Sequence, residues 1–345
     1  MKGYKAFNKG LICRDKQYAE NTVFEEESAE ICKIGMHFCK NPLDTLDYYP
    51  LIDNKGNITE FAEVEALDDA KTNDNKKFCT KKLKIGAKLN LSQFIKASVD
   101  VTYQNIKSEV DKKSLKATAG GNYATLAGGN YTTLAGGENA TLAGGENATL
   151  AGGENATLAG GENAKLAGGE NATLAGGENA KLAGGENAKL AGGNYAKLAG
   201  GENAKLAGGN YAKLAGGNYA KLAGGDNATL AGGENAKLAG GNYAKLAGGD
   251  NAKLAGGNYA TLAGGENAKL AGGNYAKLAG GENSIIVGDN HSIAKGKKGA
   301  VIVLIERDNN CNIIDFKAVQ VDGEKIKEDV LYKLKNGEFV EVGVK

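Results

Sequence analysis

An eight-residue pattern repeats without interruption through the middle of this chain and limits what the chain can fold into. Between Ala119 and Leu278 the sequence reads as twenty consecutive octads of the form Ala-Gly-Gly-(Glu/Asn/Asp)-(Asn/Tyr)-Ala-(Lys/Thr)-Leu, with Thr132 in place of one alanine. A flexible linker needs no leucine at every eighth residue. A helix is excluded as well, because each glycine would cost about 1 kcal/mol relative to alanine in a helix interior.

The octad predicts a short strand followed by a glycine corner. Side chains alternate along a strand, so the leucine and the alanine two residues before it face one side, while Lys or Thr faces the other. The glycine pair allows either a positive φ or a close backbone approach at the corner. Stacked octads would bury a continuous Leu/Ala core and pair every backbone edge, as in other solenoids. The predicted core ladder includes Leu126, Leu134, Leu142, Leu206 and Leu278.

The distribution of tyrosines favours a coil of two octads over a coil of three. In a sixteen-residue coil the fifth octad position forms two edges, and one of them carries only Tyr123 and Tyr219. A coil of three octads would scatter the tyrosines more evenly over three edges. At about 4.8 Å per coil, ten or eleven coils predict a rod about 50 Å long. The other edge, here called the tyrosine ladder, contains Tyr131, Tyr195, Tyr211, Tyr243, Tyr259 and Tyr275.

The tyrosine ladder is the predicted interface of a side-by-side homodimer. Asn precedes every Tyr of the octads, so this edge is less charged and more aromatic than the opposite one, as the centres of interfaces tend to be. The alternative is that the tyrosines stack along their own rod, which requires no partner.

Residues 1–89 have ordinary globular composition and predict a small α+β domain. Apolar alternation predicts short strands around residues 11–13, 36–39 and 61–67, and a short helix is expected after Asn41.

Three further segments complete the expected architecture. A helix is expected over residues 90–113, with Asn90 or Ser92 as its N-cap. Such a helix would cover the open edge of the first coil, which otherwise invites aggregation. The solenoid is expected over residues 114–296, and residues 297–345 predict a β-meander that caps its other end. The apolar face of the helix would contain Phe94, Ile95, Val101, Ile106 and Val110.

Charge, hydropathy and cysteine usage predict a cytoplasmic protein without nucleic-acid or membrane partners. The formal net charge of +1 offers little attraction for nucleic acid. No apolar run is long enough to span a bilayer, and the first residues lack the apolar segment of a signal peptide. Five cysteines without regular spacing are a poor disulfide framework.

A metal site is the alternative use of the cysteines. Its candidate ligands are Cys13, Cys32, Cys39 and His37. Their separations do not match a zinc ribbon or a zinc finger, so we predict no metal and no cofactor.

The octad resembles half of the sixteen-residue repeat of bacterial ice-nucleation proteins. That family also places glycine at the corners of its coils and carries a tyrosine ladder thought to join two rods. Its ice-binding faces present Thr-x-Thr rows, whereas here a single outward position holds Thr in eight octads and Lys in twelve. Long lysine side chains would interrupt an ordered layer of water, so an ice-binding rod is only an alternative.

The N-terminal block resembles an uncharacterised domain frequent in phage and prophage proteins. The resemblance rests on Cys13-Arg14, residues 35–44, Tyr48-Tyr49-Pro50 and residues 84–87, and a tail like residues 321–326 often follows the repeat in such proteins. It implies that the chain is encoded by a bacterium or a phage, and it implies no established activity.

The leading functional prediction is a non-enzymatic structural or interaction protein. A rigid rod would self-associate and present the N-terminal domain, which could bind a further, unidentified protein. The alternative is an enzyme, because Arg14, the strand around residues 36–39 and Glu63 or Glu65 loosely resemble the ADP-ribosyltransferases. Those enzymes arrange an Arg or His, a middle strand and a late Glu around nicotinamide dinucleotide. The middle Ser-Thr-Ser pattern is missing here and the spacing is short, so no catalytic residue is predicted.

Overall fold

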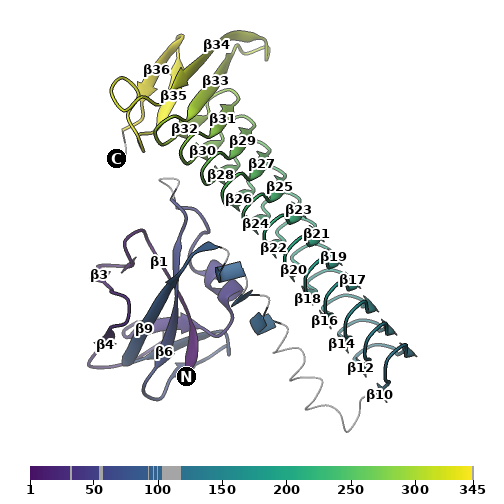
Figure 1. Ribbon diagram of the computed structural model, residues 1–345. Coiled ribbons are helices and arrows are strands. Elements are labelled where there is room, and N and C mark those ends of the chain that lie inside the picture. The colour runs from purple at the N-terminus through teal and green to yellow at the C-terminus, as the bar shows by residue number, and fades with distance from the viewer. Residues whose placement is uncertain are drawn as a thin grey trace.

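The computed structural model consists of an N-terminal domain, a long β-solenoid rod and a C-terminal cap of antiparallel strands (Figure 1). It describes residues 1–31, 33–53, 57–91, 93–95, 97–98, 100–102 and 118–343.

The N-terminal domain is a seven-stranded antiparallel sheet with two covered faces. Its strands run in the order β4-β9-β6-β1-β5-β8-β7, and a separate hairpin joins β2 to β3. One face packs Phe7, Phe38 and Ile85 into the domain's own core, whereas Ala6 and Phe61 belong to a second cluster that faces the rod. The elements are β1 (Lys2–Phe7), β2 (Ile12–Cys13), β3 (Lys16–Gln17), β4 (Val23–Glu25), β5 (Met36–Cys39), η1 (Pro42–Asp47), β6 (Glu60–Ala66), β7 (Lys71–Thr72), β8 (Lys77–Thr80) and β9 (Lys82–Leu89).

The strands expected around residues 11–13, 36–39 and 61–67 are therefore confirmed. The short helix after Asn41 is also confirmed, as the 3-10 helix η1. The side chain of Asn41 caps it by accepting a hydrogen bond from the Leu43 N–H at 3.0 Å.

A second helix follows the sheet and begins at a reciprocal cap. The Asn90 side chain accepts from the Gln93 N–H at 2.8 Å, and the Gln93 side chain accepts from the Asn90 N–H at 2.9 Å. Residues 91, 93–95, 97–98 and 100–102 are helical. Residues 103–117, which include the predicted Ile106 and Val110, lie outside the described residues, so the cover over the first coil stays a prediction. No helix among the described residues is long and apolar enough to span a membrane.

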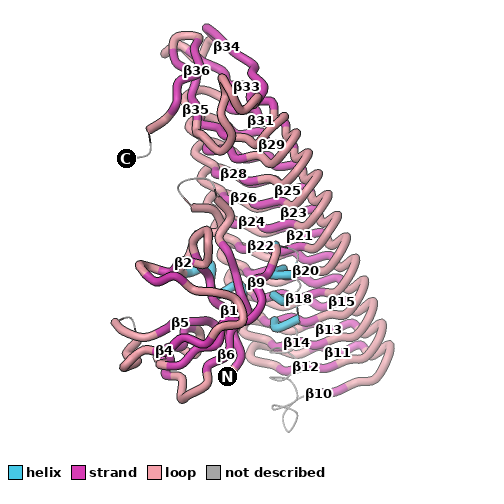
Figure 2. The backbone as a smooth tube through the Cα atoms, turned by 60° about the vertical axis from the view of Figure 1, so that its left-hand side comes forward, coloured by secondary structure: helices cyan, strands magenta, loops and turns pink. Residues whose placement is uncertain are grey.

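The rod consists of two parallel sheets wound from the octads, as Figure 2 shows. We call them the even sheet and the odd sheet, after the numbers of their parallel strands between β10 and β33. The even sheet contains β10 (Thr118–Ala119), β12 (Thr133–Ala135), β14 (Thr149–Ala151), β16 (Lys165–Ala167), β18 (Lys181–Gly184), β20 (Lys197–Gly200), β22 (Lys213–Gly216), β24 (Thr229–Gly232), β26 (Lys245–Gly248), β28 (Thr261–Ala263), β30 (Lys277–Ala279) and β32 (Ile293–Lys295). The odd sheet contains β11 (Thr125–Ala127), β13 (Thr141–Ala143), β15 (Thr157–Ala159), β17 (Thr173–Ala175), β19 (Lys189–Ala191), β21 (Lys205–Ala207), β23 (Lys221–Ala223), β25 (Lys237–Gly240), β27 (Lys253–Gly256), β29 (Lys269–Gly272), β31 (Ile285–Gly288) and β33 (Val301–Arg307).

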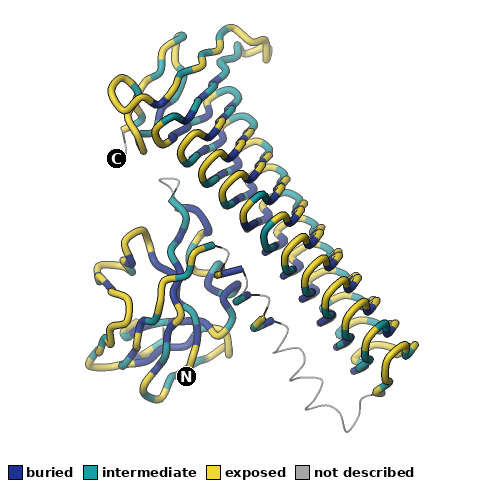
Figure 3. The backbone as a smooth tube through the Cα atoms, viewed as in Figure 1, coloured by how far each residue is buried: buried dark blue, intermediate teal, exposed yellow. Residues whose placement is uncertain are grey.

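Strand pairing confirms the coil of two octads. Leu190 pairs with Leu206 in the odd sheet and Leu198 pairs with Leu214 in the even sheet, so partners lie sixteen residues apart. The solenoid has about 11 turns. Figure 3 shows that buried residues recur from coil to coil along the rod.

The core of the rod is a double row of leucine and alanine. From the third octad on, the leucine and the alanine two residues before it, such as Leu206 and Ala204, are almost completely buried. Leu134, Leu142 and Leu278 lie in the same cluster, whereas Leu126, in the first coil, is only half-buried.

Of the two explanations for the glycine pairs, close backbone approach is confirmed, and these glycines do not have a positive φ. Positive φ falls instead on the Asn or Tyr at the fifth octad position, such as Asn187 at 55° and Tyr195 at 58°. A Cβ on Gly184 would lie 2.5 Å from the Cβ of Ala188, and one on Gly185 would lie 2.9 Å from a backbone nitrogen of the preceding coil. Both positions therefore need glycine because neighbouring atoms leave no room for a Cβ, and not because of the backbone dihedral angles there.

Antiparallel strands complete both sheets at the C-terminal end. β33 continues the odd sheet and pairs with β34 (Ile313–Gln320), while β35 (Tyr332–Lys335) follows β32 in the even sheet and pairs with β36 (Glu338–Glu341). Val321 and Tyr332 are buried in this region. The expected C-terminal strands therefore lie at the end of the rod, but they form two antiparallel pairs on separate sheets rather than one β-meander.

Replacing the glycine of a mid-rod corner should destabilise the solenoid. In Gly201→Ala the new Cβ would lie 2.8 Å from the Glu186 nitrogen, so we expect the melting temperature to fall, with a cost of about 1–3 kcal/mol. Gly129→Ala is the matched control, because its Cβ would meet no atom within 4 Å. Thermal unfolding followed by circular dichroism measures both, and equal melting of the two variants would contradict the close-packing explanation.

Candidate functional site

The N-terminal domain lies against the outer face of the even sheet, where carboxylates of η1 meet lysines of the rod. Lys197 Nζ donates to Asp44 Oδ1 at 2.7 Å and lies 3.6 Å from Asp47 Oδ2. Lys213, one coil later, forms a further ion pair with Asp47. Because outward lysines recur every sixteen residues, one short helix contacts two successive coils.

Outward alanines of the even sheet fill the rest of this junction. The alanine that follows each leucine points away from the rod core, and several of these alanines share a buried cluster with Leu43, Phe94 and Ile95. The equivalent alanines of the odd sheet, such as Ala191 and Ala207, are exposed. The alanines in the cluster are Ala199, Ala215, Ala231, Ala247, Ala263 and Ala279. The domain therefore covers one of two chemically similar faces.

The charges of the junction favour ion pairing near neutral pH. Burial alone would raise the pKa of Asp47, but the hydrogen bond from Lys213 and the charge of Lys197 outweigh it and leave this pKa lowered. Burial would likewise lower the pKa of Lys197, but Asp44 and Asp47 raise it instead. Both shifts stabilise the charged forms.

The six residues of the tyrosine ladder lie along one edge of the rod, and several of their rings stack. The ring centroids of Tyr195 and Tyr211 are 5.0 Å apart and nearly parallel. A second stack runs from Tyr243 through Tyr259 and Tyr275, with spacings of 4.8 and 4.9 Å, and ends on His291. These rings remain about half exposed. Stacking within one rod requires no partner, so the interface role of the ladder stays a prediction.

The hydrogen bonds of the fourth octad position explain why Asn precedes Tyr at the fifth. Before Tyr, an Asn side chain accepts the main-chain N–H of the next coil, as Asn194 Oδ1 does from Asn210 at 2.9 Å. Before Asn, a Glu carboxylate accepts from that Asn side chain instead, as Glu146 does from Asn147 at 2.8 Å. Tyrosine has no amide to donate to a glutamate, so Asn is the better neighbour.

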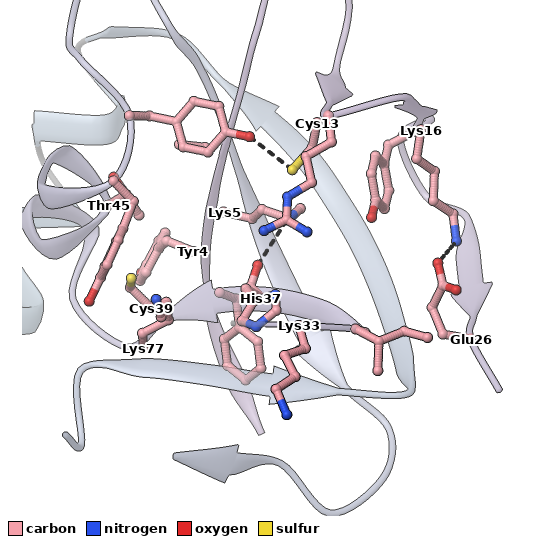
Figure 4. A pocket seen from close by; sticks show the side chains of 18 of the residues that line it. Tyr4, Lys5, Cys13, Lys16, Glu26, Lys33, His37, Cys39, Thr45 and Lys77 are labelled. Atoms are coloured by element: carbon pink, nitrogen blue, oxygen red, sulfur yellow. Dashed lines mark hydrogen bonds and ion pairs between the residues drawn. The ribbon is translucent and has the colours of Figure 1, made fainter. Parts of the chain in front are cut away.

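A cavity of about 680 Å³ opens in the N-terminal domain and is lined by residues of that domain alone (Figure 4). Lys5 lies inside it and is only 5% exposed. Its Nζ donates to the His37 carbonyl oxygen at 2.9 Å and stands 5.4 Å from the centre of the Tyr18 ring. On another wall the Tyr49 hydroxyl donates to Cys13 Sγ at 2.9 Å.

Burial shifts the ionisation of the groups that line the cavity. Desolvation and then the charges of Lys5 and Lys77 lower the pKa of His37 to about 4, so its ring is neutral at pH 7. Desolvation also lowers the pKa of Lys5 and raises that of Cys39 to about 12. The cavity thus holds a neutral imidazole and a protonated Cys39 thiol beside cationic side chains.

The structure brings together only some of the residues on which the resemblance to ADP-ribosyltransferases rests. Arg14 lines the cavity, but it lies in the turn between β2 and β3 rather than on a first strand. Residues 36–39 form β5, which also borders the cavity. Glu63 and Glu65 lie on β6 and do not line the cavity, so the acidic residue of that alternative is not beside Arg14.

The candidate metal ligands Cys13, Cys39 and His37 all border the cavity, while Cys32 lies outside the described residues. Among the residues that the structure describes, no group of three or more His, Cys, Asp or Glu side chains is arranged to hold a metal ion.

The exposed threonines of the odd sheet form a single row rather than a double one. Lys189 continues the row, and lysine then holds the position as far as Lys269. The four threonines are Thr125, Thr141, Thr157 and Thr173. A single row beside lysines offers no broad flat face for ordered water.

Comparison with known protein families gives a match in the N-terminal domain. A DUF7666 domain, a domain of unknown function, covers residues 1–97. No curated protein and no solved structure matches the chain. The match includes the seven-stranded sheet and the start of the following helix.

Lys5 is the main site residue that the sequence reasoning missed. It stands two residues before Phe7 in β1, so strand alternation puts it on the same side as a core residue. A lysine at an inward position of this strand could therefore have indicated a buried cationic site.

The neutral state of His37 should make the N-terminal domain less stable in mild acid. The folded pKa of about 4 lies below the ordinary value of 6.5. The contribution of His37 to the stability of the domain is therefore fully present above pH 6.5. It is lost as the pH drops toward 4, because the unfolded chain binds the proton first. NMR titration should place the His37 midpoint near pH 4, and His37→Gln should remove this part of the pH dependence. A midpoint near 6.5 would contradict the assignment.

Proposed function

We propose that this protein is a structural scaffold, a rigid rod that holds the DUF7666 domain at a fixed place on its side. The observation that carries the proposal is the junction between η1 and the even sheet. It combines ion pairs to two successive coils with an apolar cluster that includes alanines from several more. The cavity has no rod residue in its lining, so docking leaves it open to a partner.

The second part of the proposal is self-association through the tyrosine ladder. Its support is the set of stacked, half-exposed rings on the edge that carries fewer acidic residues. Tyrosine contributes a large contact area at a low cost in side-chain entropy, which suits an interface between two straight rods. Six lysines on the exposed face of the odd sheet disfavour that face as the contact, because two copies would bring like charges together.

Removing the carboxylates of η1 should release the domain from the rod. In Asp44→Asn with Asp47→Asn, Lys197 and Lys213 lose their partners while the outline of the junction is kept. We expect faster hydrogen exchange in residues 43–52 and a larger radius of gyration in X-ray scattering, with unchanged melting of the rod. Asp69→Asn, an exposed position of the same domain, is the control. Unaltered exchange in the double variant would refute the docked scaffold.

Changing the tyrosine ladder should abolish the proposed dimer. Asn is already the alternative residue at the fifth octad position and keeps the positive φ, so Tyr→Asn at residues 195, 211, 243, 259 and 275 preserves the fold. Light scattering at tens of micromolar should then show a monomer, against a dimer for the unchanged protein. The matched control is Tyr→Asn at 123 and 219 on the opposite edge. A monomeric unchanged protein, or a variant that still dimerises, would rule out this interface.

A further inference from the structure

The cavity of the N-terminal domain has an excess of positive charge in its lining. Five lining side chains are cationic and two are carboxylates. Glu26 is already paired with Lys16, and Lys33 reaches Glu30 outside the lining. The five cationic residues are Lys5, Arg14, Lys16, Lys33 and Lys77. A bound anion would offset this charge, whereas a metal cation would add to it.

Lys5 is the strongest single indication of an anionic ligand. It is almost completely buried, and its ammonium group bonds to the His37 carbonyl oxygen and to the Cys13 side chain, with no carboxylate among these partners. Burying a cation without an opposite charge is costly. An ammonium group has three donors, so Lys5 can bind a ligand oxygen with the third and keep its bonds to His37 and Cys13.

Arg14 supplies a second cation, from the turn between β2 and β3, whereas Lys5 lies on β1. Its guanidinium forms no ion pair or hydrogen bond with another described residue. Its backbone has a φ of 54°, in the left-handed region that costs a residue with a side chain about 1–2 kcal/mol. Gly or Asn would suit this turn better, which is consistent with a functional reason for arginine there.

Aromatic side chains form much of the remaining lining. Tyr4, Tyr18, Phe38 and Tyr48 all border the cavity. Burial raises the pKa of Tyr4 and Tyr18, so both hydroxyls stay protonated and can donate hydrogen bonds. Rings of this kind pack well against a planar organic group. A volume of about 680 Å³ is within the usual range for a small-molecule site.

We propose that the cavity binds a small phosphate monoester whose organic part is a planar ring, with Lys5 and Arg14 holding the phosphate. A phosphate monoester is close to doubly charged at neutral pH and accepts several hydrogen bonds at once. Arginine binds such a group through two parallel bonds, and lysine binds it as a compact charge. A carboxylate would balance only one of the two cations. The inference goes beyond the scaffold role, which does not depend on it.

Calorimetric titration of the full chain with adenosine 5′-monophosphate tests the proposal, with adenosine and inorganic phosphate as its two halves. We expect the monophosphate to bind more tightly than either half. Lys5→Met should weaken its binding at least tenfold, because a buried charge-assisted hydrogen bond is lost. Lys2→Met is the matched control, since Lys2 lies on the same strand, is exposed and does not line the cavity. It should change the affinity less than twofold.

Arg14→Gly keeps the test decisive if Lys5→Met does not fold. Glycine suits the positive φ, so this variant should melt at the same temperature or higher and still bind the monophosphate about tenfold more weakly. The proposal is overturned if the monophosphate does not bind at millimolar concentration or if adenosine binds as tightly. It is equally overturned if Lys2→Met weakens binding as much as Lys5→Met, or if Arg14→Gly leaves it unchanged. None of these outcomes alters the docking of the domain on the rod.

Discussion

Main-chain hydrogen bonds between successive coils set the spacing on which the rest of the rod depends. The N–H of Gly137 donates to the Gly121 oxygen at 3.0 Å, and that of Lys181 donates to the Ala164 oxygen at 2.8 Å, each one coil back. Side chains at equivalent positions are then held about 4.8 Å apart. That distance is too short for a Cβ at the second corner glycine, whereas a Cβ at the first would meet the alanine of its own octad. The same spacing suits stacked leucines and stacked tyrosine rings.

The corner residue shows how repetition makes a strained conformation acceptable. Every Asn or Tyr at the fifth octad position has a positive φ, which Asn tolerates better than Tyr. At Tyr259 the conformation is fixed by main-chain bonds to neighbouring coils, and the ring gains stacking on both sides. An isolated tyrosine such as Tyr219 has no stacked neighbour, and tyrosine is correspondingly sparse on that edge.

The rod could be predicted from the sequence because each octad repeats the same local information twenty times. Leucine spacing, glycine pairs and the distribution of tyrosines were enough for the coil length and for the inward rows. The docked domain could not be predicted, since the octads of both sheets are alike and nothing in Ala199 distinguishes it from Ala191. The cavity was also missed, because Lys5 and Arg14 meet only through the three-dimensional arrangement of β1 and the β2–β3 hairpin.

Stacking also places lysines of like charge above one another on both outer faces, and the N-terminal domain relieves this on one of them. The charge of Lys197 contributes to the lowered pKa of Lys181, after burial, as expected for neighbouring cations in a row. Asp47 reaches both Lys197 and Lys213, so one carboxylate offsets the repulsion between two coils. The corresponding row of the odd sheet stays exposed to water, which screens it. Burying the lysine row without counter-charges would be unfavourable, because the lysines repel one another. A domain whose short helix carries acidic residues supplies those counter-charges and therefore fits the even face.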